Sequence, residues 1–302
     1  MKSLVVIVGP TAVGKTSLCI DLAEALGTEI ISADSRQFFR EMNIGTAKPT
    51  PGELSRARHH FIDSHSIHEP FNAGDFEREA LALLERLFVK YNTLIMTGGS
   101  GLYINAVTEG MADIPEIDPS IRARLNQMLA EDGLTVLTEE LRQLDPVYYD
   151  QVDLNNPQRV TRALEVCLGT GKRYSELRKG DAGKRDFNVI RIGLDRPREE
   201  LYERINMRMD MMLDEGLLEE ARALHEFKDH QALQTVGYKE IFGYLEGEYD
   251  MEEAVRLLKR NSRRYAKRQM TWFGKDEKIR WFHPDDYEGI LHYIKNQIQG
   301  QG

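Results

Sequence analysis

The sequence predicts an α/β fold in which a parallel sheet is flanked by helices and interrupted by a helical insertion. Short apolar runs alternate with helical patterns, which is typical of βαβ units and a parallel sheet. The expected strands are residues 3–8, 28–33, 93–97, 188–194 and 279–282. Because 41% of the 302 residues are hydrophobic, the chain can bury a large core.

Polar or glycine residues follow each of the first three expected strands. The first leads into a Gly-Pro turn and a leucine-rich helical pattern, the second ends at Asp34, and the third at residues 98–101 (GGSG). Ligands of parallel sheets bind beyond the carboxyl ends of the strands. We therefore expect these three strand ends to converge on one site.

The pattern becomes helical and charged near Pro115. Asp118 followed by Pro119 predicts a helix start, and the Gly-Thr-Gly at 169–171 predicts a helix stop. Residues 179–186 are expected to form a flexible linker. The expected division is an α/β core domain of residues 1–114 and 187–302 and a helical insertion domain of residues 115–186.

Composition excludes several classes of protein. No apolar run approaches the roughly 20 residues that span a bilayer, and the opening run of five does not have the pattern of a signal peptide. The two cysteines, Cys19 and Cys167, argue against disulfides and a cysteine-built zinc site. A cytoplasmic protein without a membrane role is expected.

Residues 9–16 (GPTAVGKT) match the phosphate-binding pattern G-x-x-x-x-G-K-[ST] between an expected strand and an expected helix. We therefore expect a P-loop NTPase-like core. Lys15 can reach a terminal phosphate, and the Thr16 hydroxyl can ligate Mg²⁺. The residues expected to surround a pyrophosphate are Gly9, Thr11, Ala12, Val13, Gly14, Lys15 and Thr16.

Asp34 is the only acidic residue at an expected strand end in this half of the chain. A nucleotide hydrolase usually carries an acid after another apolar strand, but the third strand ends in glycines and a serine. Beside the phosphate loop, Asp34 can ligate metal or act as a general base. A carboxylate that caps a helix is an equally good interpretation of the local sequence.

A basic stripe occupies residues 256–275, which hold eight Lys or Arg residues and no acid, although the whole chain has a net charge of −9. Most of these cations recur at spacings of three and four, which places them on one helix face. Tyr265 and Trp272 lie close by. A basic helix with aromatics suits phosphate contact and base stacking on an RNA loop. The alternative is an ordinary solvated face, which normally mixes both signs.

Taken together, these motifs resemble the tRNA dimethylallyltransferases (tRNA isopentenyltransferases) over most of the chain. Besides GPTAVGKT, the matching segments are ISADSRQFFREMNIGTAKP (31–49), HHFID (59–63), FNAGDF (71–76), GGSGLY (98–103), NPQRVTRALEV (156–166), TVGYKE (235–240) and KRQMTWF (267–273). The sequence has no Cys-x-x-Cys pattern, so it resembles the shorter bacterial form.

The resemblance implies transfer of a dimethylallyl group from dimethylallyl pyrophosphate to N6 of the adenosine 3′ of the tRNA anticodon, with release of pyrophosphate. Asp34 would accept the proton of the attacking amine. Lys15, the Ser100 hydroxyl and a Mg²⁺ held by Thr16 would stabilise the leaving group. Family members usually have threonine where Ser100 stands.

The resemblance also implies substrate contacts. Arg204 and Arg208, on an expected helix at 198–213, would clamp the pyrophosphate; the alternative is solvated pairing with Glu200 or Glu203. The residues that would face the tRNA anticodon stem-loop are Asp34, Ser35, Arg36, Gln37, Ser100, Arg122, Gln158, Arg159, Val160, Thr161, Arg162, Gly237, Tyr238, Lys239, Arg263, Arg264, Lys267 and Arg268.

Two other enzymatic functions remain open at this stage, as does a non-enzymatic nucleotide-binding regulator, which would explain Asp34 and Ser100 poorly. An adenylate isopentenyltransferase, which acts on free nucleotides, would share the phosphate loop and Asp34 but would need neither the insertion nor the basic stripe. A P-loop kinase of small molecules would share residues 9–16 alone. A monomer is expected in each case.

Overall fold

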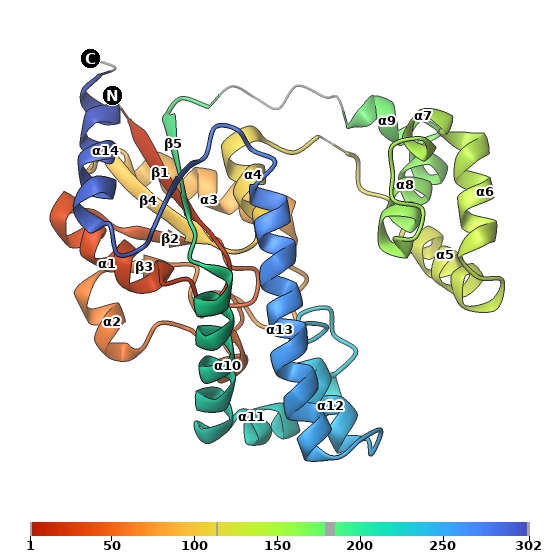
Figure 1. The fold of residues 1–302 in the computed structure, drawn as a ribbon. Helices are drawn as coiled ribbons and strands as arrows, with labels where there is room; N and C mark the ends of the chain where they lie inside the picture. The colour runs from red at the N-terminus through yellow and green to blue at the C-terminus, as the bar shows by residue number, and fades with distance from the viewer. Residues whose placement is uncertain (1, 113, 179–184, 301–302) are drawn as a thin grey trace. The chain divides into compact units, whose positions relative to one another are not determined.

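The computed structural model describes residues 2–112, 114–178 and 185–300, so most of the expected linker lies outside the described residues. The chain forms two compact units (Figure 1). One unit consists of Met1–Thr108 and Arg185–Gly302, and the other is Glu109–Lys184. Within the described residues, no helix combines the length and the apolar character that crossing a membrane requires.

The first unit contains a six-stranded sheet in the order β3-β2-β4-β1-β5-β6, and its strand pairs are parallel. The strands are β1 (Ser3–Val8), β2 (Ile30–Ser32), β3 (His59–His60), β4 (Thr93–Gly98), β5 (Asn188–Leu194) and β6 (Arg280–Phe282). The predicted α/β class is confirmed. The sequence analysis missed β3, because two residues are too few to show a periodic pattern.

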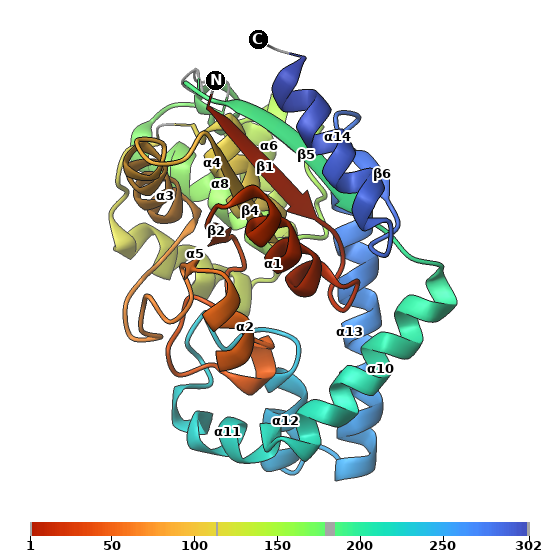
Figure 2. The same ribbon diagram turned by 90° about the vertical axis from the view of Figure 1, so that its left-hand side faces the viewer.

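Helices cover both faces of this sheet (Figure 2). On one face lie α1 (Lys15–Leu26) and α14 (Tyr287–Gln299), and on the other lie α3 (Ala73–Leu87) and α4 (Gly101–Glu109). Within β1, Val5 and Ile7 pack toward the first pair of helices, and Leu4, Val6 and Val8 toward the second. This burial on both sides explains why the strand is a continuous apolar run.

A helical layer with its own core adjoins the sheet within the first unit. Its members are η1 (Ile44–Thr46), α10 (Arg198–Asp214), α11 (Leu217–Ala223), η2 (His225–Phe227), α12 (Tyr238–Leu245) and α13 (Met251–Phe273), whereas α2 (Pro51–Arg56) packs against α1. Helices α10 and α13 pack side by side (Figures 1 and 2). The helix expected at 198–213 is α10, which ends one residue later than predicted. The basic stripe lies on α13, except for Lys275, which follows this helix.

The second unit is helical. It comprises α5 (Pro119–Glu131), α6 (Leu134–Leu144), α7 (Pro146–Tyr149), α8 (Pro157–Thr170) and α9 (Tyr174–Leu177). Leucines of α5, α6 and α8 form its core. Asp118 caps α5 and Gly171, at φ 68°, ends α8, so the predicted start and stop signals are confirmed.

Candidate active site

Three strand ends meet at one edge of the sheet, as the sequence predicted. Val8 is in register with Gly98, and Ser32 with Thr97, so β1, β2 and β4 end beside one another. The loop after β1 is the phosphate-binding motif, the loop after β2 begins with Asp34, and the turn after β4 holds Ser100. The sheet therefore places all three features within reach of a single ligand.

The phosphate-binding loop wraps around the Lys15 ammonium. Lys15 Nζ donates to the carbonyls of Gly9, at 2.9 Å, and Pro10, at 2.8 Å. A Cβ on Gly9 would lie 2.7 Å from the Leu194 carbonyl oxygen, and its φ is +153°, so only glycine fits here. Helix α1 begins at Lys15, so the positive end of its dipole faces the loop.

The negative charge of Asp34 affects the pKa values of side chains in this loop and on α13. Burial lowers the pKa of Lys15 to about 8, while the negative charge of Asp34 raises that pKa and the positive charge of Arg208 lowers it further. Burial, and then the charge of Asp34, raise the pKa of Tyr265 to about 12. The charge of Asp34 thus acts both on Lys15 of the phosphate loop and on Tyr265 of the helix that carries the basic stripe.

The local role of Asp34 is to cap a turn. Its Oδ1 accepts the backbone N–H of Arg36 at 3.0 Å, and residues 35–43 form no helix. The helix-cap interpretation of the sequence was therefore wrong. Among the described residues no hydrogen-bond donor contacts Oδ2, which leaves this oxygen available to a substrate.

Ser100 lies beside this turn. Its hydroxyl accepts the backbone N–H of Ser35 at 3.0 Å and donates to the Ser35 hydroxyl, also at 3.0 Å. The turn after β4 is thereby joined to the loop after β2, one residue from Asp34. Such a hydroxyl can turn toward a developing negative charge without moving the backbone.

Arg204 and Arg208 approach the phosphate loop from α10. Arg204 Nε donates to the Ala12 carbonyl at 2.9 Å, and Arg208 Nη2 lies 3.5 Å from the Ala47 carbonyl. Burial lowers the pKa of Arg208. Glu200 pairs with Arg196 instead, so the solvated pairing considered from the sequence is not what forms.

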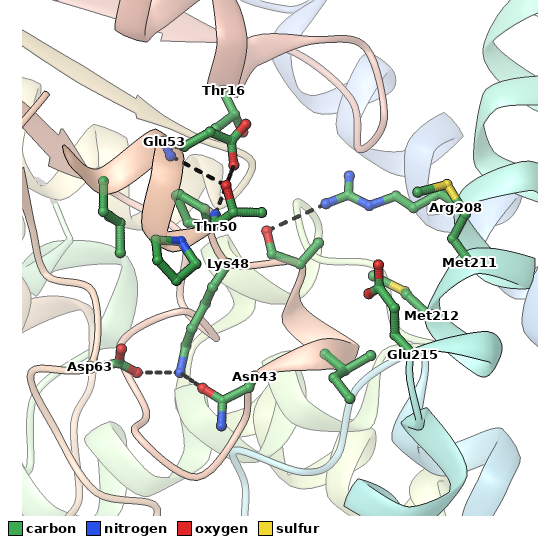
Figure 3. A pocket seen from close by; sticks show the side chains of 15 residues that line it. Thr16, Asn43, Lys48, Thr50, Glu53, Asp63, Arg208, Met211, Met212 and Glu215 are labelled. Carbon is green, nitrogen blue, oxygen red and sulfur yellow. Dashed lines mark hydrogen bonds and ion pairs between the residues drawn. The ribbon is translucent and has the colours of Figure 1, made fainter. Parts of the chain in front are cut away.

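A cavity of about 500 Å³ opens beside Thr16 and Arg208 (Figure 3). Met211 and Met212 give it an apolar wall on α10, whereas α2 and the loop before it form the opposite wall. Lys48 also lines the cavity, but its ammonium is already bonded to Asp63 and to Asn43. Arg208 is therefore the cation best placed to meet an anion there.

A second cavity, of about 520 Å³, lies on the Ser100 side. Ser35, Arg36 and Ser100 form one side of it, and aromatic and basic side chains of α13 form another. The α13 residues are Tyr265, Arg268, Gln269 and Trp272. Aromatic faces and cations around a cavity of this size suit a nucleobase and its phosphates.

The basic stripe is smaller than the sequence indicated. Arg256 pairs with Glu253 and Lys259 with Asp210, and Arg263 Nη1 donates to Asn206 Oδ1 at 2.6 Å. Within the described part of the chain, no carboxylate lies within ion-pair distance of three exposed cations of α13. These are Arg264, Lys267 and Arg268.

Several side chains implied by the resemblance are not accessible. Tyr238 is fully buried and its hydroxyl donates to Glu220 Oε1 at 2.6 Å, so its expected RNA contact must be corrected to a structural role. Burial raises the pKa of its phenol. Val160 and Thr161 are likewise buried, on the inner face of α8, and their side chains cannot meet RNA. The amide of Gln37 is engaged by the Thr46 and Ala47 carbonyls.

The helical unit exposes the remaining predicted residues on α5 and α8. Arg122 and Arg162 donate to the same oxygen of Glu165, at 3.0 and 2.9 Å. Gln158 and Arg159 are exposed at the start of α8. Two of the arginines predicted to bind RNA in this unit are thus held together by one carboxylate, that of Glu165.

Sequence reasoning missed two residues that hold the site together. Gln269 lies between the phosphate loop and the Ser100 turn; it falls in the KRQMTWF segment, but the sequence analysis gave it no role. Glu220 accepts the backbone N–H groups of residues 43–45 at 2.8–2.9 Å, and thereby holds the loop that follows Asp34. A lone glutamate on an exposed helix gives no signal of this role.

The fold and the site define a P-loop α/β transferase, and comparison with known proteins agrees. Residues 37–276 match the family described as IPP transferase. A relative from Cytophaga hutchinsonii, named tRNA dimethylallyltransferase, is 52% identical over 99% of this chain and 98% of its own. One from Bacteroides fragilis, named tRNA dimethylallyltransferase 1, is 47% identical over 99% of each chain.

Solved structures give the same result. The tRNA isopentenylpyrophosphate transferase of Bacillus halodurans has a TM-score of 0.74 and 38% identity, over 99% of this chain and 98% of that one. A eukaryotic dimethylallyltransferase, described as acting on tRNA, has a TM-score of 0.77 and 25% identity, over 95% and 75%. The chain belongs to the IPP transferase family.

Proposed function

We propose that this protein transfers a dimethylallyl group from dimethylallyl pyrophosphate to N6 of the adenosine 3′ of the anticodon in tRNA, and releases pyrophosphate. The observation that carries the proposal is the position of one carboxylate, Asp34, at the strand end beside the phosphate-binding loop. The next residue, Ser35, lines the same cavity as the aromatic and basic side chains of α13. The names of the relatives support the same substrates.

The site residues divide the chemistry between them. The exocyclic amine of adenine is a weak nucleophile, so a base must take its proton as the bond to carbon forms; Asp34 Oδ2 serves this purpose. The C–O bond to pyrophosphate breaks, and negative charge develops on the bridging oxygen. Lys15, Arg208 and the Ser100 hydroxyl stabilise that charge.

Magnesium fits this arrangement through the Thr16 hydroxyl. Among the described residues, no cluster of three or more His, Cys, Asp or Glu side chains could hold a metal ion. Mg²⁺ needs few protein ligands when phosphates and water complete its shell, and Thr16 offers an oxygen beside the cavity. When bound, the ion would neutralise charge on the pyrophosphate.

The cavity beside Ser100 is the proposed place for the target base. A base in a stacked loop must leave its stack to reach a buried carbon, and Tyr265 and Trp272 offer it aromatic surfaces. Phosphates of the RNA would lie on the exposed cations of α13, and the helical unit would contact the RNA through Arg122, Gln158, Arg159 and Arg162. We propose that the protein acts as a monomer. We propose the cytoplasm as the compartment.

A labelling experiment tests the proposed function. Radiolabelled dimethylallyl pyrophosphate and Mg²⁺ are incubated with unmodified anticodon stem-loop or with AMP, and the labelled product is identified. Label on the stem-loop is expected, and none on a matched stem-loop with guanosine at the target position, because guanosine has no C6 amine. Label on AMP alone would favour the adenylate transferase, and ATP turnover without label would favour the kinase.

Replacement of Arg264, Lys267 and Arg268 by glutamine is expected to flatten the salt dependence of stem-loop binding. Three lost phosphate contacts should reduce the slope of log K against log salt by about 2, at about 0.7 per contact for single strands. The slope is measured by titration at several salt concentrations. As a control, glutamine at Arg256 and Lys259, whose charges are paired internally, should change the slope by less than half as much. An unchanged slope in the triple variant would place the RNA surface elsewhere.

A further inference from the structure

Gln269 of α13 uses both ends of its amide to join two loops of the site. Its Oε1 accepts the backbone N–H of Thr11 at 2.9 Å, and its Nε2 donates to the Gly99 carbonyl at 3.0 Å. Only 6% of the residue is exposed. A buried amide with both ends satisfied is a strong geometric constraint, because losing either partner leaves an unpaired polar group.

The contact with the turn after β4 leaves no room for adjustment. A Cβ on Gly99 would lie 2.2 Å from Gln269 Nε2, so the amide approaches the bare backbone of a glycine. The next residue, Ser100, is bonded to Ser35, which follows Asp34. A continuous series of contacts therefore runs from the phosphate loop, through Gln269 and Ser100, to the loop of the carboxylate.

The strands themselves do not fix this geometry. β1 and β4 are paired up to Val8 and Gly98, but Thr11 lies beyond the last ladder contact. Misplacing a reacting group by about 1 Å can cost about 10²-fold in rate. We propose that Gln269 is a positioning residue, which fixes the phosphate loop against the Ser100 turn so that the leaving pyrophosphate and the attacking amine are aligned. This inference rests on the proposed function.

Two substitutions of similar length test the role. Gln269→Met removes both hydrogen bonds and is expected to lower kcat for stem-loop prenylation about 10–100-fold, with less than about a threefold change in KM for the RNA. In the Gln269→Glu variant, the charged carboxylate still accepts the Thr11 N–H. Its second oxygen has no proton to donate, so it faces the Gly99 carbonyl oxygen without a hydrogen bond. As a neutral acid the side chain can both accept and donate, like the native amide.

The Gln269→Glu variant therefore has a pH signature. Burial would raise the pKa of the new carboxyl, so its neutral form gains population as the pH falls. The ratio of its kcat to that of the native enzyme is expected to rise as pH decreases from about 9 to 6. Titration of the general base affects both enzymes and cancels in the ratio. The corresponding ratio for Gln269→Met should stay flat.

Thermal unfolding at each pH separates positioning from stability. Ser262→Ala is the matched control, because Ser262 is a buried polar residue of the same helix whose hydroxyl bonds, among the described residues, only to Met209 Sδ; it should lower Tm without lowering kcat. A Gln269→Met enzyme that remains folded at the assay temperature with native kcat would overturn the inference. So would a flat ratio for Gln269→Glu. Failure of the native enzyme to label any stem-loop would instead refute the proposed function.

Discussion

Asp34→Asn is expected to lower single-turnover prenyl transfer about 10²–10⁴-fold, the usual contribution of a positioned general base. Asparagine keeps the side-chain oxygen that accepts the Arg36 N–H, so the turn should persist. It lacks the basic oxygen that would take the amine proton. The rate is measured with enzyme in excess over labelled donor, so that product release does not mask the chemical step.

RNA binding provides the internal check on this variant. Stem-loop affinity should stay within about threefold of the native value, because the cations of α13 are unchanged. Asp250→Asn is a matched control, since the exposed Asp250 carboxylate also accepts a backbone N–H, at the start of α13, and lines neither cavity of the site. It should retain the native rate. A native single-turnover rate in Asp34→Asn would remove Asp34 from the mechanism.

The parts of the site that follow from strand order could be predicted from the sequence. A glycine-rich loop, an acid and a GGSG turn, each placed after an apolar run, must meet if the runs form neighbouring parallel strands. Asp34 and Ser100 were found in this way, although they are 66 positions apart in the sequence. Local pattern and sheet topology sufficed for them.

The parts that depend on side-chain partners could not be predicted. Gln269 is 258 positions from Thr11, and no local pattern reveals which polar residue of a helix will face a distant loop. The same limit affected the basic stripe, because the pairing of Lys259 with Asp210 depends on how α10 and α13 pack. The burial of Tyr238 has the same origin, since its hydroxyl is held by Glu220 of α11.

Lys15→Met is expected to lower kcat/KM for dimethylallyl pyrophosphate about 10²–10³-fold, the range found when one donor to a developing oxyanion is removed. Its effect should also depend on pH. The pKa of Lys15 is lowered to about 8 in the free protein, so the ammonium is formed below that pH and lost above it. A bound pyrophosphate raises this pKa, because it favours the charged form.

Pyrophosphate binding must therefore take up a proton above pH 8, and native affinity should weaken as pH rises through that value. Inorganic pyrophosphate with Mg²⁺ is the probe, titrated between pH 7 and 9.5. The ratio of native to Lys15→Met affinity cancels titration of the ligand, and it should fall by up to tenfold per pH unit above 8. Lys90→Met, at an exposed lysine remote from the site, should give a ratio near one throughout. A native-to-Lys15→Met ratio that stays constant over this range would mean that the Lys15 ammonium does not bind the pyrophosphate.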